Sequence, residues 1–208
     1  MPATISALAE QLADVGRSAV GRGLVLASAG NLSTRVPGRE AFVITAAGTW
    51  LDRLGPEDFS VVGLDGLVLD GHPRPSTEWR LHRRTYQVRP DVNAVVHLHP
   101  QLAVVLDALG YPIRLLTLDH MAYLRTVRRI PFFPNGSDEL ADAAAEASIG
   151  CDAIILAHHG CSTLGETIEM AYRRALNLED AAQNTYRCLQ LGDRETAFPG
   201  GVELAVHQ

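Results

Sequence analysis

The stretch that decides the fold reads Val92-Asn93-Ala94-Val95-Val96-His97-Leu98-His99. Its apolar, β-branched residues predict a buried strand. Side chains two residues apart on a strand share a face, so His97 and His99 would point to the same side, about 7 Å apart along the strand. Leu98 would then point the other way, into the core. Two histidines at this spacing are a common metal-ligand pair, although a polar strand face also carries such a pair without a metal.

A second pair of histidines follows another apolar run. His158-His159-Gly160 comes directly after residues 153–157, which predict a further buried strand. Adjacent histidines at a strand end point to opposite sides, so at most one of them joins the first pair. Three of the chain's other histidines have no partner pattern, and we expect them at the surface or in packing positions: His72, His82 and His207.

A carboxylate is available upstream, in Pro75-Ser76-Thr77-Glu78-Trp79. Two prolines followed by Ser-Thr-Glu predict a helix start, where hydroxyls cap the helix and free backbone N–H groups bind phosphate. Without the histidines, this segment would be an ordinary capped helix with an exposed glutamate. Three imidazoles and one carboxylate with an open position are typical of a catalytic zinc or a related divalent ion. A cupin also uses His-X-His, but its glutamate follows the pair, whereas Glu78 precedes it.

Helical and strand patterns alternate around these motifs. Helices are expected at residues 4–23, 77–88, 100–109, 138–149 and 168–190, and strands at 42–44, 59–64, 67–69, 92–99, 115–118 and 152–157. Residues 28–31 are expected to form a loop. We therefore predict one α/β domain spanning residues 1–208, with a mixed or antiparallel sheet between helices.

The composition excludes several kinds of chemistry. The chain has 208 residues and a formal net charge of -6, and 47% of its residues are hydrophobic, as in a globular enzyme. All 18 basic residues are arginine, and the absence of lysine excludes Schiff-base catalysis and the Walker A phosphate loop. The acidic balance argues against binding of nucleic acid.

The chain carries no membrane or secretion signal that we recognise. No run of about 18 apolar residues is present, so no membrane span is expected. Cys151, Cys161 and Cys188 are odd in number, are spaced unlike C-X-X-C, and are not preceded by a signal peptide. We therefore expect free thiols and a cytoplasmic protein.

Five segments between residues 5 and 190 together resemble the class II aldolase/adducin family, most closely its fuculose-phosphate and rhamnulose-phosphate aldolase branch. The segments are residues 28–35 (SAGNLSTR), 44–48 (ITAAG), 75–80 (PSTEWR), 89–99 (RPDVNAVVHLH) and 158–160 (HHG). The resemblance implies a zinc ion held by His97, His99 and His159. It also implies that Glu78 is a fourth ligand that becomes the catalytic acid/base when substrate arrives, whereas His158 points away.

The resemblance further implies a sugar-phosphate substrate and a homotetramer with active sites at its interfaces. The residues implied to hold the substrate phosphate are Gly30, Asn31, Gly48, Ser76 and Thr77. The implied reaction cleaves a ketose 1-phosphate to dihydroxyacetone phosphate and an aldehyde through a metal-stabilised enediolate. Family aldolases protonate the leaving fragment with a tyrosine from the neighbouring subunit. Counting back from Ile130-Pro131 puts His120 at that position and Tyr123 one helical turn away, so both are candidate donors.

Two other functions remain open. The sugar-phosphate aldolases carry a hydroxyl residue just before the loop glycine, where this chain has Ala47. A metal-dependent epimerase, dehydratase or decarboxylase acting on a sugar phosphate would use the same fold and metal. A non-catalytic module like the adducin head would be expected to lack the ligand set, and all four candidate ligands are present here.

Overall fold

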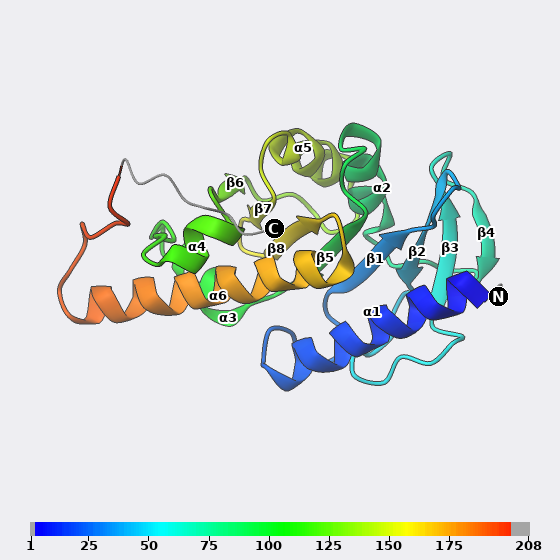
Figure 1. Ribbon diagram of the computed structural model, residues 1–208, viewed down its shortest axis with the longest axis horizontal. Helices are drawn as coiled ribbons and strands as arrows, with labels where there is room; N and C mark the ends of the chain where they lie inside the picture. The colour runs from blue at the N-terminus through cyan, green and yellow to red at the C-terminus, as the bar shows by residue number, and fades with distance from the viewer. Residues whose placement is uncertain (1–2, 201–208) are drawn as a thin grey trace.

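The computed structural model describes residues 3–200. Within them, eight strands form one sheet in the order β4-β3-β2-β1-β5-β8-β7-β6 (Figure 1). Neighbouring strands are antiparallel, except that β6 and β7 are parallel. The strands are β1 (Asn31–Arg35), β2 (Ala41–Thr45), β3 (Phe59–Gly63), β4 (Val68–Gly71), β5 (Ala94–Leu98), β6 (Arg128–Ile130), β7 (Ala153–Leu156) and β8 (Gly160–Gly165).

Helices cover both faces of this sheet (Figure 1). The described residues form α1 (Ala3–Gly21), α2 (Trp79–Val88), α3 (Gln101–Ala108), α4 (Leu118–Tyr123), α5 (Asp138–Ser148) and α6 (Ile168–Gln190). Apolar side chains of α1, α3 and α6 pack on one face, and those of α2 and α5 pack on the other. The predicted α/β fold, with a mixed sheet between helices, is confirmed. No helix in the described part of the chain has both the length and the apolarity that crossing a bilayer requires.

The central strands bring polar residues onto the face that α2 covers. Leu98 lies in the core beneath α1, α3 and α6, as predicted, so His97 must face the opposite side. On the neighbouring strands, Asn31 of β1 and Ser162 of β8 are directly opposite His97. Directly opposed residues share a face, so the register places these polar side chains beside His97.

Two parts of the sheet differ from the expectation. Residues 115–118 are not a strand: the backbone N–H groups of Leu116 and Thr117 donate to Nδ1 of His120, and Thr117 caps α4. A side chain therefore takes the hydrogen bonds that a ladder would need. The strands β1, β6 and β8 were not predicted. Both β1 and β8 carry small or polar residues on buried faces, so they lack the apolar run that marked β5.

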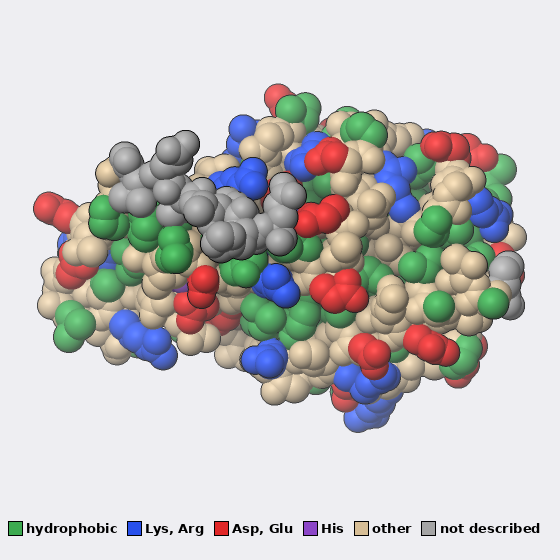
Figure 2. Space-filling model, viewed as in Figure 1, with side chains coloured by type: hydrophobic (Ala, Val, Ile, Leu, Met, Phe, Trp, Pro, Cys, Tyr) green, Lys and Arg blue, Asp and Glu red, His purple; other side chains and the backbone are tan. Residues whose placement is uncertain are grey.

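Acidic and basic side chains are interspersed with apolar ones over the face viewed in Figure 2. This mixture matches the composition of the chain, in which 24 acidic residues slightly outnumber 18 basic ones. Charge is thus spread over this face. The polar residues beside His97 differ from these surface charges because they are buried.

Candidate metal centre

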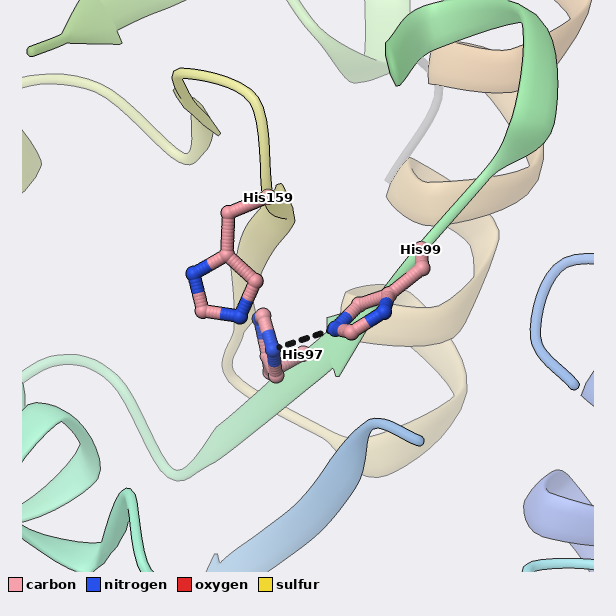
Figure 3. A group of neighbouring side chains, drawn as sticks. All are labelled: His97, His99 and His159. Carbon is pink, nitrogen blue, oxygen red and sulfur yellow. Dashed lines mark hydrogen bonds between the residues drawn. The ribbon is translucent and has the colours of Figure 1, made fainter. Parts of the chain in front are cut away.

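Three histidine rings converge at one end of the central strands (Figure 3). His97 lies near the end of β5, His99 follows that strand, and His159 lies in the turn between β7 and β8. One ring nitrogen from each lies within 4.8 Å of the other two. The Nε2 atoms of His97 and His99 are 3.0 Å apart. Nitrogen donors from two separate places in the chain therefore surround one point, as in a metal site.

The ring of His97 is fixed by a hydrogen bond on its outer side. Its Nδ1 atom donates to the backbone carbonyl of Cys161 on β8, at 2.8 Å, and the side chain is fully buried. Because Nδ1 keeps its proton in this bond, Nε2 is the nitrogen that would give up its proton and present a lone pair to an ion at the centre. Such a bond from the far ring nitrogen to a carbonyl is typical of metal-binding histidines.

Glu78 completes the cluster from the N-terminal end of α2. Its Oε2 atom is 3.1 Å from Nε2 of His97, and its Oε1 atom is 3.5 Å from Nε2 of His159. The residue is only 4% exposed, and Oε1 is buried without a hydrogen-bond partner. A buried carboxylate oxygen without a partner is costly unless a cation satisfies it. The donor set and this unpartnered oxygen therefore fit a divalent metal ion.

The protonation states suit metal binding. Burial, together with the charge on His97, lowers the pKa of His99 to about 3 and that of His159 to about 4, so both rings are neutral at pH 7. Burial raises the pKa of Glu78, but its interactions with His97, His159 and Asn31 outweigh this and leave the pKa well below its usual range. Burial lowers the pKa of His97, and the Glu78 charge reverses that shift. The cluster thus holds an ionised carboxylate that attracts a cation.

The turn that carries His159 has a strained backbone. His158 adopts φ +56°, a left-handed conformation that costs non-glycine residues energy. Its N–H donates to Oδ2 of Asp107 on α3, at 2.9 Å. The other carboxylate oxygen of Asp107 accepts from Nε of Arg129 at 2.5 Å. His158 itself is exposed, whereas His159 is partly buried against the cluster. Asp107 therefore holds the turn that presents His159.

Two loops next to the cluster contain the residues expected to bind phosphate. A bridge between Ala46 and Pro75 brings the loop of Gly48 alongside the segment of Ser76 and Thr77. Thr77 is exposed, and Oγ of Ser76 accepts a 3.3 Å hydrogen bond from the N–H of Glu78.

Gly30 and Asn31 lie on the β1 side of the cluster. Gly30 has φ +76°, and a Cβ there would lie 2.8 Å from the carbonyl oxygen of His97, so only glycine fits without a shift. Gly48 also has a positive φ, +77°. The Nδ2 atom of Asn31 donates to Oε2 of Glu78 at 2.9 Å. Asn31 therefore contacts the carboxylate directly, a contact that the sequence did not suggest.

The family follows from the whole chain. A family model described as the Class II Aldolase and Adducin N-terminal domain matches residues 10–186. The chain belongs to this family. It is 36% identical over 196 residues to the 5-methylthioribulose-1-phosphate/5-deoxyribulose-1-phosphate aldolase of Rhodospirillum rubrum, covering 94% of this chain and 87% of that protein. It is 31% identical over 203 residues to the 3-oxo-tetronate 4-phosphate decarboxylase of Escherichia coli, covering 95% and 93%.

A solved L-fuculose 1-phosphate aldolase superposes on the chain with a TM-score of 0.87 and 28% identity, covering 94% of this chain and 92% of that one. The resemblance to class II aldolases is therefore confirmed, and so is the prediction of an enzyme of this family. These relatives differ in the reactions that their names give.

The two candidate proton donors of this class II aldolase family member lie on α4, which packs against α6. His120 is fully buried, and both of its ring nitrogens are occupied: Nδ1 accepts from backbone N–H groups, and Nε2 donates to Oδ2 of Asp180 at 2.8 Å. Tyr123 is partly exposed, with Arg173 over its ring at 5.3 Å. The structure does not bring either residue to the histidine cluster within one subunit, and a role across an interface stays a prediction.

His82 was not predicted to belong to the site. It was expected at the surface or in packing; it is fully buried, as a packing residue would be, but its Nε2 atom also lies 2.5 Å from Oδ1 of Asn31. A signal was present in the spacing, because residues four apart on a helix share a face and His82 follows Glu78 by four. His72 is partly exposed beside Arg74, and His207 lies outside the described residues.

Proposed function

We propose that this protein is a zinc-dependent class II aldolase that cleaves a ketose 1-phosphate to dihydroxyacetone phosphate and an aldehyde. The observation that carries the proposal is the convergence of three histidine nitrogens on a buried carboxylate oxygen that has no hydrogen-bond partner. His97, His99, His159 and Glu78 would hold the ion. A bound divalent ion supplies a Lewis acid that draws electrons from the substrate carbonyl, the task that lysine performs in Schiff-base aldolases.

Glu78 is suited to move the proton. Its depressed pKa keeps it ionised at neutral pH, so it would be ready to act as a base once substrate takes its place as a ligand. Asn31 holds Oε2, whereas Oε1 has no hydrogen-bond partner, so Oε1 is the atom that would take the proton. The carboxylate is buried, and exclusion of water strengthens its interaction with a substrate proton.

The phosphate would bind beside the cluster, between the loop of Gly48, the segment of Ser76 and Thr77, and the start of β1. Gly30, Asn31, Gly48, Ser76 and Thr77 would hold it, with free backbone N–H groups replacing the lysine that the chain lacks. Phosphate held there would orient the reacting carbon toward Glu78, so binding energy remote from the chemistry supports the reaction.

Tyr123 is the better candidate for the proton donor to the leaving fragment. Both ring nitrogens of His120 are already hydrogen-bonded inside its own subunit, whereas Tyr123 is partly exposed. A donor role for Tyr123 requires a neighbouring subunit, so we propose a homotetramer with active sites at its interfaces. We also propose that the protein is cytoplasmic.

The test is retro-aldol cleavage of a panel of fuculose, rhamnulose, ribulose and deoxyribulose 1-phosphates. We expect the zinc-loaded protein to release dihydroxyacetone phosphate from at least one member, and a chelator to abolish that release. His159→Gln should remove activity together with metal, whereas His72→Gln, at a histidine outside the cluster, should keep both. A zinc-loaded protein that cleaves none of the sugars would refute the proposal.

A second candidate function is decarboxylation, epimerisation or dehydration of a sugar phosphate on the same centre. It is favoured by Ala47, which lacks the hydroxyl of the sugar-phosphate aldolases, and by the likeness to the Escherichia coli decarboxylase. Product analysis distinguishes the candidates: carbon dioxide release, loss of water, or inversion without cleavage would support the second one.

A further inference from the structure

A continuous series of buried, hydrogen-bonded polar groups leads from Tyr86, near the C-terminal end of α2, to the carboxylate of Glu78. The hydroxyl of Tyr86 lies 2.7 Å from Oγ of Ser33, which lies 2.7 Å from Nδ1 of His82. Nε2 of His82 lies 2.5 Å from Oδ1 of Asn31, whose Nδ2 atom lies 2.9 Å from Oε2 of Glu78. All five residues are at most 4% exposed. Water is thus excluded, and each group depends on its neighbours in the series.

The chemistry of these groups decides which atom donates in each hydrogen bond of the series. Glu78 is an ionised carboxylate and only accepts, so the Asn31 amide must turn its N–H toward it and its oxygen toward His82. That oxygen only accepts, so Nε2 of His82 is the donor. Nδ1 of His82 then accepts from the Ser33 hydroxyl, and Ser33 accepts from Tyr86.

The electrostatic surroundings agree with these donors and acceptors. Burial lowers the pKa of His82 to about 3, so its ring is neutral and has one donor and one acceptor nitrogen. Burial also raises the pKa of Tyr86, which therefore keeps its proton.

The arrangement makes the orientation of Asn31 depend on His82. Without the N–H of His82, Oδ1 of Asn31 would be buried and unpaired, a penalty that favours rotation of the amide. A rotated amide would place its oxygen against the Glu78 carboxylate, where like partial charges repel. Glu78 would then lose the bond that holds Oε2, and the direction in which Oε1 points would no longer be fixed.

We propose that His82 is a positioning residue, which fixes the Asn31 amide and through it the carboxylate of Glu78 for proton transfer. Its effect on turnover rests on the proposed function. Its effect on the geometry of the carboxylate does not, because Glu78 lies against the histidine cluster whatever the reaction is.

Two substitutions of similar shape test this role. In His82→Gln, the side-chain N–H lies close to the position of Nε2 and can still donate to Asn31. His82→Met fills the same space without a donor. Both remove the ring and its acceptor for Ser33, so a purely structural role predicts equal losses for the two variants. Ser162→Ala is the matched control, since its buried hydroxyl lies opposite His97 but has no hydrogen-bond partner.

Activity is measured as kcat and KM for the substrate that the wild type cleaves. We expect His82→Met to lower kcat by about 10- to 100-fold, the usual effect of losing a partner that orients a ligand. KM should rise by less than kcat falls, because only Asn31 among the proposed phosphate-binding residues is disturbed. His82→Gln should recover most of the loss, and Ser162→Ala should match the wild type. Equal kcat values in the two His82 variants, or a loss that lies in KM, would overturn the proposal.

A second measurement does not need substrate. Co²⁺ replaces zinc at such sites, and its visible absorption reports the ligand geometry. The spectrum of His82→Met should differ from the wild type, whereas His82→Gln and Ser162→Ala should resemble it. If the wild type cleaves no ketose phosphate, the proposed function fails, and the spectra still decide the role of His82. Identical spectra for all four proteins would overturn it.

Ser33→Ala serves if His82→Met does not fold. It keeps the His82 ring but removes the donor to Nδ1, so we expect a smaller fall in kcat, by about threefold to tenfold, with KM unchanged. An unchanged kcat in Ser33→Ala would contradict the proposal that this series of hydrogen bonds orients Glu78.

Discussion

Replacing Asp107 should both destabilise the protein and weaken its metal centre. Its Oδ2 atom accepts the N–H of His158 at 2.9 Å, and the carboxylate is 4% exposed. Loss of a hydrogen bond to a buried charged group costs about 1.5–3 kcal/mol. The pair with Arg129 adds at most about 1 kcal/mol, because the Arg129 side chain is 54% exposed and solvent screens it. Asp107→Ala should therefore cost about 3 kcal/mol of unfolding free energy.

The assay combines thermal unfolding with metal titration. A loss of about 3 kcal/mol lowers Tm by about 6–12 °C in a chain of this size. The turn that carries His159 would relax from its left-handed conformation, so zinc affinity should fall by about 10- to 100-fold. Asp107→Asn is the matched control, because its amide oxygen still accepts from His158, and it should cost less than about 1 kcal/mol.

A third variant tests the strain directly. Glycine tolerates a positive φ, so His158→Gly in the Asp107→Ala background should recover about 1 kcal/mol and part of the zinc affinity. Equal stability and equal zinc affinity in Asp107→Ala and Asp107→Asn would refute the idea that this carboxylate holds the turn.

Three further predictions follow from the centre. Glu78→Gln should keep the fold and bound metal but slow proton exchange between solvent and dihydroxyacetone phosphate by about 100- to 10,000-fold, measured by NMR; exchange at the wild-type rate would remove Glu78 as the base. Zinc removal should lower Tm, by an amount that grows with the ratio of zinc to Kd in the starting sample, because the ion binds only the folded chain; a Tm that does not respond to zinc would contradict this. Metal-free protein should lose stability as the pH falls from 6.5 toward 4, because His82, His99 and His159 have pKa values of about 3, 3 and 4 when folded and near 6.5 when unfolded, so the unfolded chain binds more protons. Urea titrations at pH 7 and 5 measure this loss, and equal unfolding free energies would contradict it.

The parts of the fold that the sequence predicted are those where a local pattern and the final environment agree. β5 is apolar and β-branched and lies between β1 and β8, so its run of residues already indicated a buried strand. β8 is equally buried, but it is built from glycine, cysteine, serine and threonine, and its burial comes from neighbouring strands. Residues 115–118 are the opposite case, because their apolar run predicts a strand that does not form. The N–H groups of Leu116 and Thr117 bond to the side chain of His120 instead of to a neighbouring strand.

The candidate ligands could be found because each belongs to a short motif. His97 and His99 share a strand, and His159 and Glu78 follow or begin regular elements. His82 could not be recognised in the same way, because its role depends on Asn31, a residue distant in the chain that only the β1–β5 register brings near. Spacing along α2 puts His82 on the face of Glu78, but pairing between strands decides what that face meets.

The distribution of the ligands along the chain has a consequence for folding kinetics. His97 and His99 are near neighbours in sequence, so an unfolded chain could already hold an ion loosely with these two rings. His159 lies in the short turn between β7 and β8, and it joins them only after the long-range antiparallel β5–β8 pair has formed, which is the slow part of folding. Tight metal capture in a refolding experiment would therefore appear late, and its rate would report assembly of the centre of the sheet.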